Sequence, residues 1–447
     1  MLTAISPIDG RYRRGTAALA DYFSEYALIK YRLWVEVEYL IALSELPQLP
    51  LAAVFEQQPN WREALRQICT RFTPDEAQKV KDIEKTTNHD VKAVEYYLKS
   101  QLPQGIVAQY AEWVHFGLTS QDINNTAIPL SLRAFFAEQY QPAFAQLTGV
   151  LDDLSQRWAD VPMLSRTHGQ PASPTLLGKE IAVFAERLRG QFAQLEAVPY
   201  SAKFGGAVGN FNAHYAAYPQ VDWHDFAQHL LLGWGLKRSY PTTQIEPYDN
   251  IAAMCHAYAR INTILIDCCR DMWTYISLDY FKQKIVAGEV GSSAMPHKVN
   301  PIDFENAEGN FGIANALFEH FAAKLPISRL QRDLTDSTVL RNIGVPLAHT
   351  IIGINSLQKG LGKLLLNKTA LQRDLDQHWE VLAEAIQTIL RCEQYEQPYE
   401  ALKALTRNHE RVTPDLLHQF IKQLPINNAL KAELEQLTPF NYTGRWR

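Results

Sequence analysis

Cysteine is scarce in this chain: five of its 447 residues are cysteines, and no pair has the CxxC spacing. An odd number of cysteines without that spacing gives no support to a disulfide framework or a zinc site. The HExxH motif and comparable clusters of metal ligands are also missing. We therefore expect no metal, and reduced cysteines buried in the core: Cys69, Cys255, Cys268, Cys269 and Cys392.

Long apolar runs and a strong excess of either charge are also missing. No run of about 18 uncharged apolar residues occurs, and the opening MLTAISPIDGRYRR lacks the apolar stretch of a signal peptide. The formal net charge of −5 argues against a surface that coats nucleic acid. The sequence therefore predicts a cytoplasmic enzyme with neither a membrane nor a nucleic acid as partner.

The short motifs of several enzyme classes are not found either. There is no GxxxxGK[ST] phosphate loop, and the GGAVG of residues 205–209 does not fit GxGxxG. A GxSxG nucleophile motif is also missing. The sequence thus gives no support to folds that bind nucleoside triphosphates or dinucleotides, nor to an α/β-hydrolase, and we expect no cofactor.

Helical periodicity dominates what is present. Apolar residues recur at three- and four-residue steps in two segments, Ile181, Phe184, Leu188, Phe192 and Leu195, and then Ile261, Ile264, Leu265, Cys268, Met272 and Ile276. The second set lies in the most hydrophobic long helix candidate, residues 258–281. A cap followed by proline marks predicted helix starts at Thr73-Pro74, Ser173-Pro174 and Thr413-Pro414, the first as a capping box. Strand-like alternation is scarce, so the predicted fold class is all-α.

The chain length indicates several domains. A single core rarely serves 447 residues, and a prior of about 150 residues per domain gives roughly three. We predict an N-terminal helical domain over residues 1–108, a central long-helix bundle over residues 109–362 and a C-terminal helical domain over residues 363–447. Long apolar helices need more cover than one chain supplies, so we expect a bundle shared between subunits.

The stretch GSSAMPHKVNP at residues 291–301 brings two adjacent hydroxyls, an imidazole and an ammonium together. Pro296 argues against a helix interior or a central strand, so the stretch is predicted to be a loop. Loops often carry function, although composition alone also fits a solvated connector. Ser292 can act as a base only if backbone donors and a cation such as Lys298 stabilise its alkoxide.

Three further polar segments interrupt the helical pattern, each at a predicted helix start or turn. They are TTNHD at residues 86–90, TSQDINN at residues 119–125 and SRTHGQP at residues 165–171. Exposed backbone N–H groups at helix starts bind anions, which makes Thr119 and Ser120 candidates for holding a carboxylate or phosphate. The alternative is that both residues are simple helix caps.

Two histidines lie in these segments. His168 is followed by Gly169 in a predicted turn, and an imidazole there suits proton transfer to a leaving nitrogen. Glu305 is a candidate to orient it, if the fold brings the two together. A lone histidine is more often structural, and His89 has the same ambiguity. A Ser–His pair also fits acyl transfer, against which the missing GxSxG argues.

Arginines flank a run of hydroxyls and carboxylates near residue 335. Arg329, Arg332 and Arg341 surround the DLTDST of residues 333–338. Guanidinium groups beside Ser and Thr suit a phosphate monoester. The alternative is a salt-bridged helix surface.

Together these motifs resemble the fumarase/aspartase superfamily. GSSAMPHKVNP looks like its signature, and His297 within it, with the following IDFEN, resembles the adenylosuccinate lyase family, in its bacterial branch, more than the other members. GRY at residues 10–12, TTNHD, TSQDIN, SRTHGQP, TTQIEP at residues 242–247 and QRDLTDSTVLRN at residues 331–342 extend the resemblance in order over nearly the whole chain.

The resemblance implies three mostly helical domains and a homotetramer whose central helices form a twenty-helix core. It also implies active sites assembled from three subunits, which accounts for the scattered polar segments. The implied substrates are two nucleotides, adenylosuccinate and SAICAR, the succinylated carboxamide nucleotide of purine synthesis. Each would be cleaved by β-elimination of fumarate.

The resemblance also implies a role for each motif residue. His168 is the acid that protonates the departing nitrogen, Ser292 is the base, and Glu305 orients His168. The succinyl carboxylates are held by Thr119, Ser120, Ser293, Lys298 and Asn300. Gln244 and Asn306 position the substrate. The nucleotide, chiefly its phosphate, is bound by Arg11, Tyr12, His89, Arg332, Ser337 and Arg341. The neighbouring residues that also bind substrate are Asn88, Asp90 and Thr338. His89 and Lys298 are also candidates for the catalytic set.

Two alternatives remain at this stage. Another fumarate-releasing lyase, such as one acting on argininosuccinate, would not need the phosphate-binding arginines. A catalytically silent helical structural protein would not need to keep His168, Ser292 and Lys298 together with those arginines.

Overall fold

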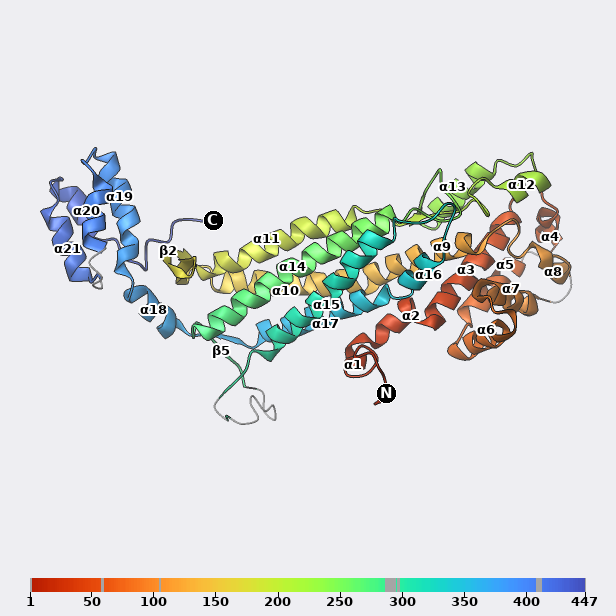
Figure 1. The fold of residues 1–447 in the computed structure, drawn as a ribbon, viewed down its shortest axis with the longest axis horizontal. Coiled ribbons are helices and arrows are strands. Elements are labelled where there is room, and N and C mark those ends of the chain that lie inside the picture. The colour runs from red at the N-terminus through yellow and green to blue at the C-terminus, as the bar shows by residue number, and fades with distance from the viewer. Residues whose placement is uncertain are drawn as a thin grey trace. The chain divides into compact units, whose positions relative to one another are not determined.

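The computed structural model describes residues 2–57, 60–103, 106–285, 295, 298–406 and 412–446. Most of them are helical and the strands are short, so the predicted all-α class is confirmed (Figure 1). They fall into two compact units. Unit 1 consists of Met1–Phe144, Gln191–Thr263 and Gly309–Ile354, and unit 2 of Ala145–Gly190, Ile264–Glu308 and Asn355–Arg447. The three domains expected from the sequence stay a prediction.

The elements divide between the units as follows. Unit 1 holds α1 (Arg13–Thr16), α2 (Ala20–Phe23), α3 (Glu25–Leu43), α4 (Leu51–Gln57), α5 (Trp61–Thr70), α6 (Pro74–Thr87), α7 (Asp90–Gln101), α8 (Ile106–Gln109), α9 (Ser120–Phe135), β3 (Ser201–Ala202), α12 (Asn212–Ala217), α13 (Trp223–Gly233), β4 (Lys237–Arg238) and α16 (Thr335–Leu340). Unit 2 holds β1 (Pro162–Thr167), β2 (Gln170–Leu176), β5 (Phe281–Gln283), β6 (Leu364–Leu366), α18 (Lys368–Asp376), α19 (Ala383–Cys392), α20 (Pro398–Thr406), α21 (Pro414–Gln423) and α22 (Asn428–Glu435). Residues of both units occur in α10 (Gln141–Arg157), α11 (Leu177–Glu196), α14 (Asp249–Ser277), α15 (Ile302–Lys324) and α17 (Gly344–Gly362).

The two periodic apolar segments form helices, as predicted. One lies in α11, where Leu188 is fully buried, and the other in α14, where Leu265 and Cys268 are fully buried. The expected limits of residues 258–281 are wrong, because α14 begins at Asp249 and ends at Ser277. Asp279 has a φ of 64°, which breaks the helix before β5 begins. Aspartate tolerates that left-handed conformation better than most residues.

The predicted cap-then-proline starts give a mixed result. Thr73 Oγ1 accepts from the Glu76 amide at 3.4 Å, and Thr413 Oγ1 accepts from the Leu416 amide at 3.3 Å, so α6 and α21 begin as expected. The expected start at Ser173-Pro174 is wrong: both residues lie in β2, with Pro174 opposite Leu164. A two-stranded ribbon leaves each strand an open edge, which tolerates the missing N–H of proline.

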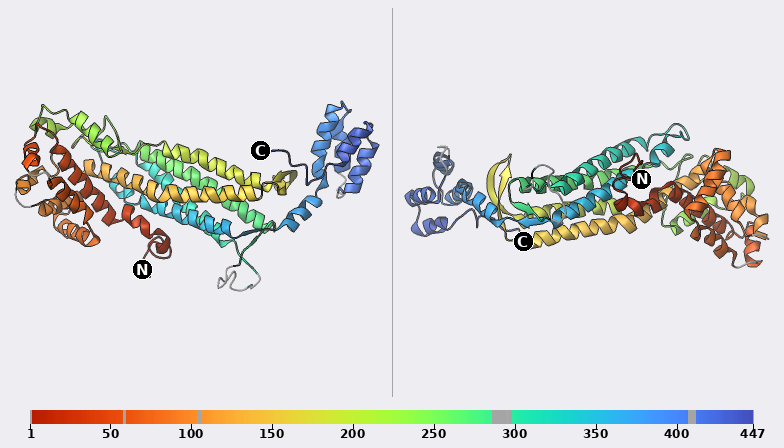
Figure 2. Two further views of the ribbon diagram at one scale, coloured as in Figure 1. Left: turned by 180° about the vertical axis from the view of Figure 1, so that it is seen from behind. Right: turned by 90° about the horizontal axis from the view of Figure 1, so that it is seen from below.

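Helix α3 organises the N-terminal part of unit 1. Its buried residues, such as Leu33 and Val37, pack in one core with residues of α5, α6, α7 and α9 (Figures 1 and 2). Ser24 caps α3 by accepting from the Ala27 amide at 3.1 Å. Because α7 and α9 both pack on α3, the first turns of these two helices, which carry polar segments, are held near one another.

Glycines allow the long helices to approach closely within each unit. In unit 1, a Cβ on Gly353 of α17 would lie 2.5 Å from the ring of Phe311 on α15. Tyr258 of α14 stacks on Phe318 of α15, with ring centroids 5.3 Å apart. In unit 2, a Cβ on Gly178 of α11 would lie 2.2 Å from a backbone oxygen of α10. At both places a Cβ would clash, so these helices approach more closely than a residue larger than glycine allows.

Unit 2 carries an antiparallel hairpin and a cluster of C-terminal helices. Strands β1 and β2 pair from Pro162 opposite Leu176 to Thr167 opposite Gln170, and β5 pairs with β6. Figure 2 shows the hairpin at the start of α11. The C-terminal helices share a core that includes Leu382 and Ile421. The hairpin is therefore the longest sheet element in the described part of the chain.

The cysteine prediction holds in part. Cys255, Cys268 and Cys269 are buried and Cys69 is half-buried. Cys392 is exposed, so the expectation of a core position is wrong there. It lies at the end of the short amphipathic α19, on the face turned to water. Among the described helices, none combines the length and apolarity required to cross a membrane.

Acidification will destabilise the fold through His214, which is buried in unit 1. Burial lowers the pKa of His214 from 6.5 to about 4, with Lys203 adding to the shift and Asp122 opposing it. Between these pH values the unfolded chain binds a proton that the folded chain does not, so stability falls as the pH falls through this window. The full loss is about 3 kcal/mol. Denaturant titrations across this pH range measure it. The variant His214→Gln will show a flatter pH dependence than the wild type, and an unchanged dependence would contradict the assignment.

Candidate active site

The start of α9 forms an open helix N-terminus in unit 1. Thr119 and Ser120 are half-buried there. The backbone N–H of Thr119 donates to Asp122 Oδ2 at 2.8 Å, so the carboxylate of the first turn caps the helix. Thr119 is thus the N-cap of α9, whereas Ser120 is its first residue. The hydroxyls of Thr119 and Ser120 remain at a helix end that favours anions.

Asp122 is itself anchored by a buried cation. Its Oδ1 lies 2.8 Å from Lys203 Nζ, and both side chains are fully buried. The backbone amides of Gly205 and Gly206 also donate to this carboxylate, at 2.8 Å and 3.1 Å. Burial lowers the pKa of Lys203, and Asp122 opposes the shift. The α9 start is therefore fixed to the glycine-rich segment at residues 205–209.

The TTNHD segment joins two helices and brings a histidine to α9. Asn88 ends α6 with a φ of 49°, and His89 is the N-cap of α7. His89 Nδ1 accepts from the Lys92 amide at 3.0 Å, so a neutral ring carries its hydrogen on Nε2. That nitrogen lies 3.5 Å from Ser120 Oγ. The Nε2–H group of His89 thus points at the start of α9, where Ser120 lies.

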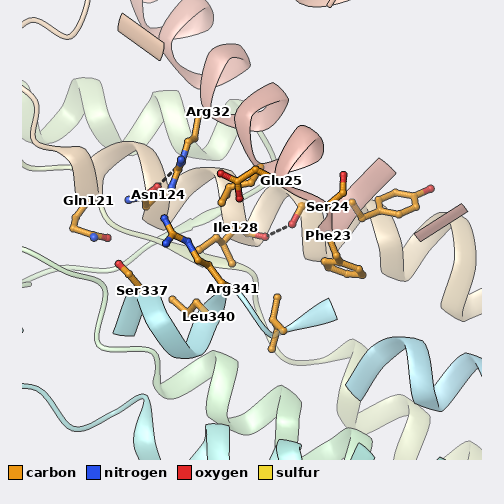
Figure 3. Close-up of a pocket in the computed structure, with 14 residues that line it drawn as sticks. Phe23, Ser24, Glu25, Arg32, Gln121, Asn124, Ile128, Ser337, Leu340 and Arg341 are labelled. Carbon is orange, nitrogen blue, oxygen red and sulfur yellow. Dashed lines mark hydrogen bonds between the residues drawn. The ribbon is translucent and has the colours of Figure 1, made fainter. Parts of the chain in front are cut away.

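A pocket of about 120 Å³ lies beside this segment and contains two arginines (Figure 3). Arg341 Nη2 and Arg32 Nη2 both donate to Asp90 Oδ2, at 2.9 Å and 2.8 Å. Burial alone would raise the pKa of Asp90, but the two guanidinium groups and the Val91 amide hold it below its usual value. The pocket also contains Ser337 and Gln121.

The arginine-rich segment forms the short helix α16 and the turn before it. Arg332 Nη2 donates to Ser337 Oγ at 2.7 Å and also approaches Asp336. When its amide is turned to accept, the oxygen of Gln121 lies 2.6 Å from Arg332 Nη2. The segment is therefore salt-bridged, and Arg332 also contacts a serine hydroxyl, while phosphate binding stays a prediction.

Two buried residues connect α16 to α9. Tyr248 OH donates to Asp336 Oδ2 at 2.9 Å and accepts from Asn125 Nδ2 at 2.7 Å. The same Asn125 accepts from the Glu246 amide at 2.9 Å. The TTQIEP segment is thereby tied to α9, and its Gln244 donates to the Ala207 carbonyl at 3.0 Å.

Three predicted nucleotide-binding residues lie apart from these contacts. Arg11 is exposed, and Tyr12 is the N-cap of the short α1. Neither lines the Figure 3 pocket or the neighbouring hollow that Arg341 also lines. Thr338 is exposed, and its carbonyl accepts from Asn342. The structure therefore gathers Asn88, His89, Asp90, Thr119, Ser120, Arg332, Ser337 and Arg341, but not these three.

In unit 2, His168 occupies the tip of the β1–β2 hairpin. His168 and Gly169 form a two-residue turn with φ values of 52° and 73°. Such turns favour glycine or asparagine, and a histidine with positive φ is uncommon. The ring is exposed, and among the described residues it makes no hydrogen bond or ion pair. The hairpin thus presents a free imidazole.

The other described candidates of unit 2 lie at and near the start of α15. Glu305 is exposed and accepts from the indole N–H of Trp273 at 3.1 Å. Asn306 donates to Ser356 Oγ at 3.0 Å. Lys298 is exposed and Asn300 is half-buried. No hydrogen bond joins Glu305 to His168 in the described chain, so the orienting role of Glu305 stays a prediction.

The remaining candidates lie outside the described residues: Ser292 and Ser293, and with them His297. In the described part of the chain, no group of three or more Cys, His, Asp or Glu side chains gathers as metal ligands would.

Sequence reasoning missed the buried residues that hold the site together. Arg32, Asp122, Lys203, Tyr248 and Asp336 all contact predicted residues or their neighbours. Lys203 had one usable signal, because it is a lone cation in an apolar stretch, and such a cation is seldom buried without a partner.

Comparisons with known proteins identify the family. A lyase family model matches residues 10–314, and an adenylosuccinate lyase C-terminal model matches residues 328–443. An adenylosuccinate lyase of Dictyostelium discoideum is 57% identical over 99% of this chain and 97% of its own length. Those of Legionella pneumophila (strain Corby) and Escherichia coli (strain K12) are 52% and 49% identical over the same shares.

The chain belongs to the adenylosuccinate lyase family. Membership confirms the resemblance that the motifs indicate. The relatives named above come from Dictyostelium discoideum, Legionella pneumophila and Escherichia coli. Among solved structures, a fumarate lyase from Mesorhizobium sp. BNC1 has a TM-score of 0.73 and 19% identity over 96% of this chain and 95% of that one. A 3-carboxy-cis,cis-muconate lactonizing enzyme from Pseudomonas putida has a TM-score of 0.69 and 19% identity, over 96% and 94%. At this identity both show the shared fold alone.

Proposed function

We propose that this chain is a carbon–nitrogen lyase of purine nucleotide biosynthesis. It eliminates fumarate from adenylosuccinate to give AMP, and from SAICAR to give AICAR. The observation that carries the proposal is the identity of 49–57% to adenylosuccinate lyases over 99% of the chain. The arginine and histidine cluster at the α9 start supports it, because a nucleotide monophosphate needs such cations.

The nucleotide is held by unit 1. Its phosphate is bound by Arg332, Ser337 and Arg341, together with Arg11 and Tyr12. Guanidinium groups and hydroxyls donate to phosphate oxygens with suitable geometry. His89 donates from Nε2, with Asn88, Asp90 and Thr338 beside the nucleotide and Gln244 positioning it. The α9 start, with Thr119 and Ser120, receives a succinyl carboxylate.

The chemistry is a β-elimination that needs one base and one acid. The Ser292 alkoxide takes the proton from the carbon next to a succinyl carboxylate, and the electron pair forms the carbon–carbon double bond. The carbon–nitrogen bond breaks, and the nitrogen takes a proton from the His168 imidazolium. The products are fumarate and the free nucleotide. Proton transfer by a placed imidazole contributes about 10²–10⁴-fold.

Removing the proton adds a negative charge to the two that the succinyl carboxylates already carry and makes the neighbouring carboxylate a dianion, so donors must be placed where that new charge appears. Ser293, Lys298 and Asn300 hold the carboxylates together with the α9 start, and Asn306 positions the substrate. Lys298 also stabilises the serine alkoxide. Losing one such donor typically costs about 10²–10³-fold in rate.

The enzyme works as a homotetramer in the cytoplasm, with a twenty-helix core and each site built from three subunits. His168 supports this, because it is exposed and has no hydrogen bond within the described residues, whereas a catalytic imidazole needs partners and dry surroundings. Glu305 of another subunit orients it. No cofactor is required, because proton transfer and charge stabilisation account for the whole reaction.

Adenylosuccinate turnover tests the proposal. The purified protein should convert adenylosuccinate to AMP and fumarate, seen as a loss of the substrate's ultraviolet absorbance, and should also cleave SAICAR. Cleavage of argininosuccinate instead would favour another fumarate-releasing lyase. No turnover of any of the three by a folded tetramer would favour a silent structural protein.

A further inference from the structure

Arg32 on α3 is the most buried cation of the pocket in Figure 3. Its side chain is 3% exposed. Nε donates to Asn124 Oδ1 and Nη2 to Asp90 Oδ2, both at 2.8 Å. Nη1 is buried and has no hydrogen-bond partner in the described chain. Burying a guanidinium whose Nη1 leaves both of its N–H groups unpaired is costly, so packing alone does not explain why Arg32 is there.

Asp90 receives two cations on one oxygen. Arg341 is half-exposed and approaches from the end of α16, whereas Arg32 is enclosed. Figure 3 shows the guanidinium groups of Arg32 and Arg341 pointing toward one another. Glu25 lines the pocket and lies 3.1 Å from Lys81, which also pairs with Glu84 at 2.6 Å. Two guanidinium groups thus share one oxygen of Asp90, and an anion that binds Arg341 would end this sharing.

Arg32 is buried and Arg341 is half-exposed, which indicates that the two arginines have different roles. An exposed guanidinium can change partners at little cost, whereas a buried one cannot leave its carboxylate without leaving a buried charge unpaired. If Arg341 moves to a phosphate, Asp90 keeps its charge and still needs a cation. Arg32 is already in place for that.

We infer that Arg32 is a positioning residue that neutralises Asp90 and so frees Arg341 to bind the phosphate of the nucleotide. The inference rests on the proposed function for the identity of that anion. Arg32 acts through Asp90, and its role is therefore visible in binding rather than in the chemical step. The two arginines are coupled because both donate to Asp90 Oδ2.

Substitutions at Arg32 test this role, with AMP binding by calorimetry and adenylosuccinate kinetics as readouts. In Arg32→Met, Asp90 retains Arg341 as its only guanidinium partner, so the Kd of AMP and the KM rise about tenfold or more while kcat changes little. In Arg32→Lys a cation remains beside Asp90, and binding stays near that of the wild type. Lys30→Met is the matched control, because Lys30 is a cation on the same helix. Its ammonium lies over the ring of Tyr26 rather than beside Asp90.

The decisive comparison is a double-mutant cycle with Asp90→Asn. Once the carboxylate is gone, Arg32→Met should weaken AMP binding by no more than about twofold further. An equal loss in both backgrounds, or Arg32→Lys being as defective as Arg32→Met, would show that Arg32 only supports the fold through Asn124. A wild-type protein that neither binds AMP nor cleaves adenylosuccinate would overturn the proposed function instead.

Discussion

Replacing His168 by asparagine will lower kcat for adenylosuccinate cleavage by about 10²–10⁴-fold, the usual contribution of a placed proton donor. Without an acid, the nitrogen must leave as an anion. Asparagine is the suitable substitute because it tolerates the positive φ of 52° that this turn position requires. The ring is exposed and makes no hydrogen bond to the part of the chain that the structure describes, so the fold should not suffer.

The controls for this variant are its assembly and its affinity for nucleotide. The residues proposed to bind AMP lie in unit 1, so His168→Asn should keep the Kd of AMP and the melting temperature of the wild type. Ser292→Ala should lose activity to a similar degree, since the base is equally required. Near-normal turnover by His168→Asn would remove this residue from the role of acid.

Replacing Lys203 by methionine will destabilise the protein by about 3–5 kcal/mol, the usual result of removing one partner of a buried ion pair. Lys203 is fully buried against Asp122, which would keep its charge with only amide donors left. Denaturant-induced unfolding measures the loss. Because Asp122 caps α9, the variant should also bind the succinyl group less well.

The double variant Asp122→Asn with Lys203→Met separates charge from packing. It removes both charges, so it should recover much of the stability that Lys203→Met loses, because replacing both partners of a buried pair is far less costly than removing one. If the double variant is less stable than Lys203→Met by the full cost of Asp122→Asn alone, the two residues are not coupled.

The sequence predicted the helical fold because amphipathic periodicity is a local signal. The apolar steps of α11 and α14 and the caps at Thr73 and Thr413 depend only on neighbours a few residues away. Ser173-Pro174 has the same local chemistry, but its pairing with β1 decided the outcome. That pairing is a tertiary contact, and no cap rule contains it.

The candidate site divides in the same way. The polar segments around His89, Thr119 and Arg332 were found because each concentrates unusual residues in a short stretch. Arg32, Lys203 and Tyr248 were not, because their partners lie 58, 81 and 88 positions away along the chain (90 − 32, 203 − 122 and 336 − 248). Only tertiary packing, such as that of α3 on α7 and of β3 on α9, brings them together.

Mixing two inactive variants tests most directly whether the nucleotide-binding residues of one chain serve the acid of another. His89→Gln disables a residue of unit 1, and His168→Asn disables one of unit 2. After the two proteins are unfolded and refolded together, mixed tetramers should cleave adenylosuccinate, because some sites then receive both intact histidines from different subunits. Mixed tetramers, verified by native mass spectrometry, that are as inactive as either parent would contradict a site shared between chains.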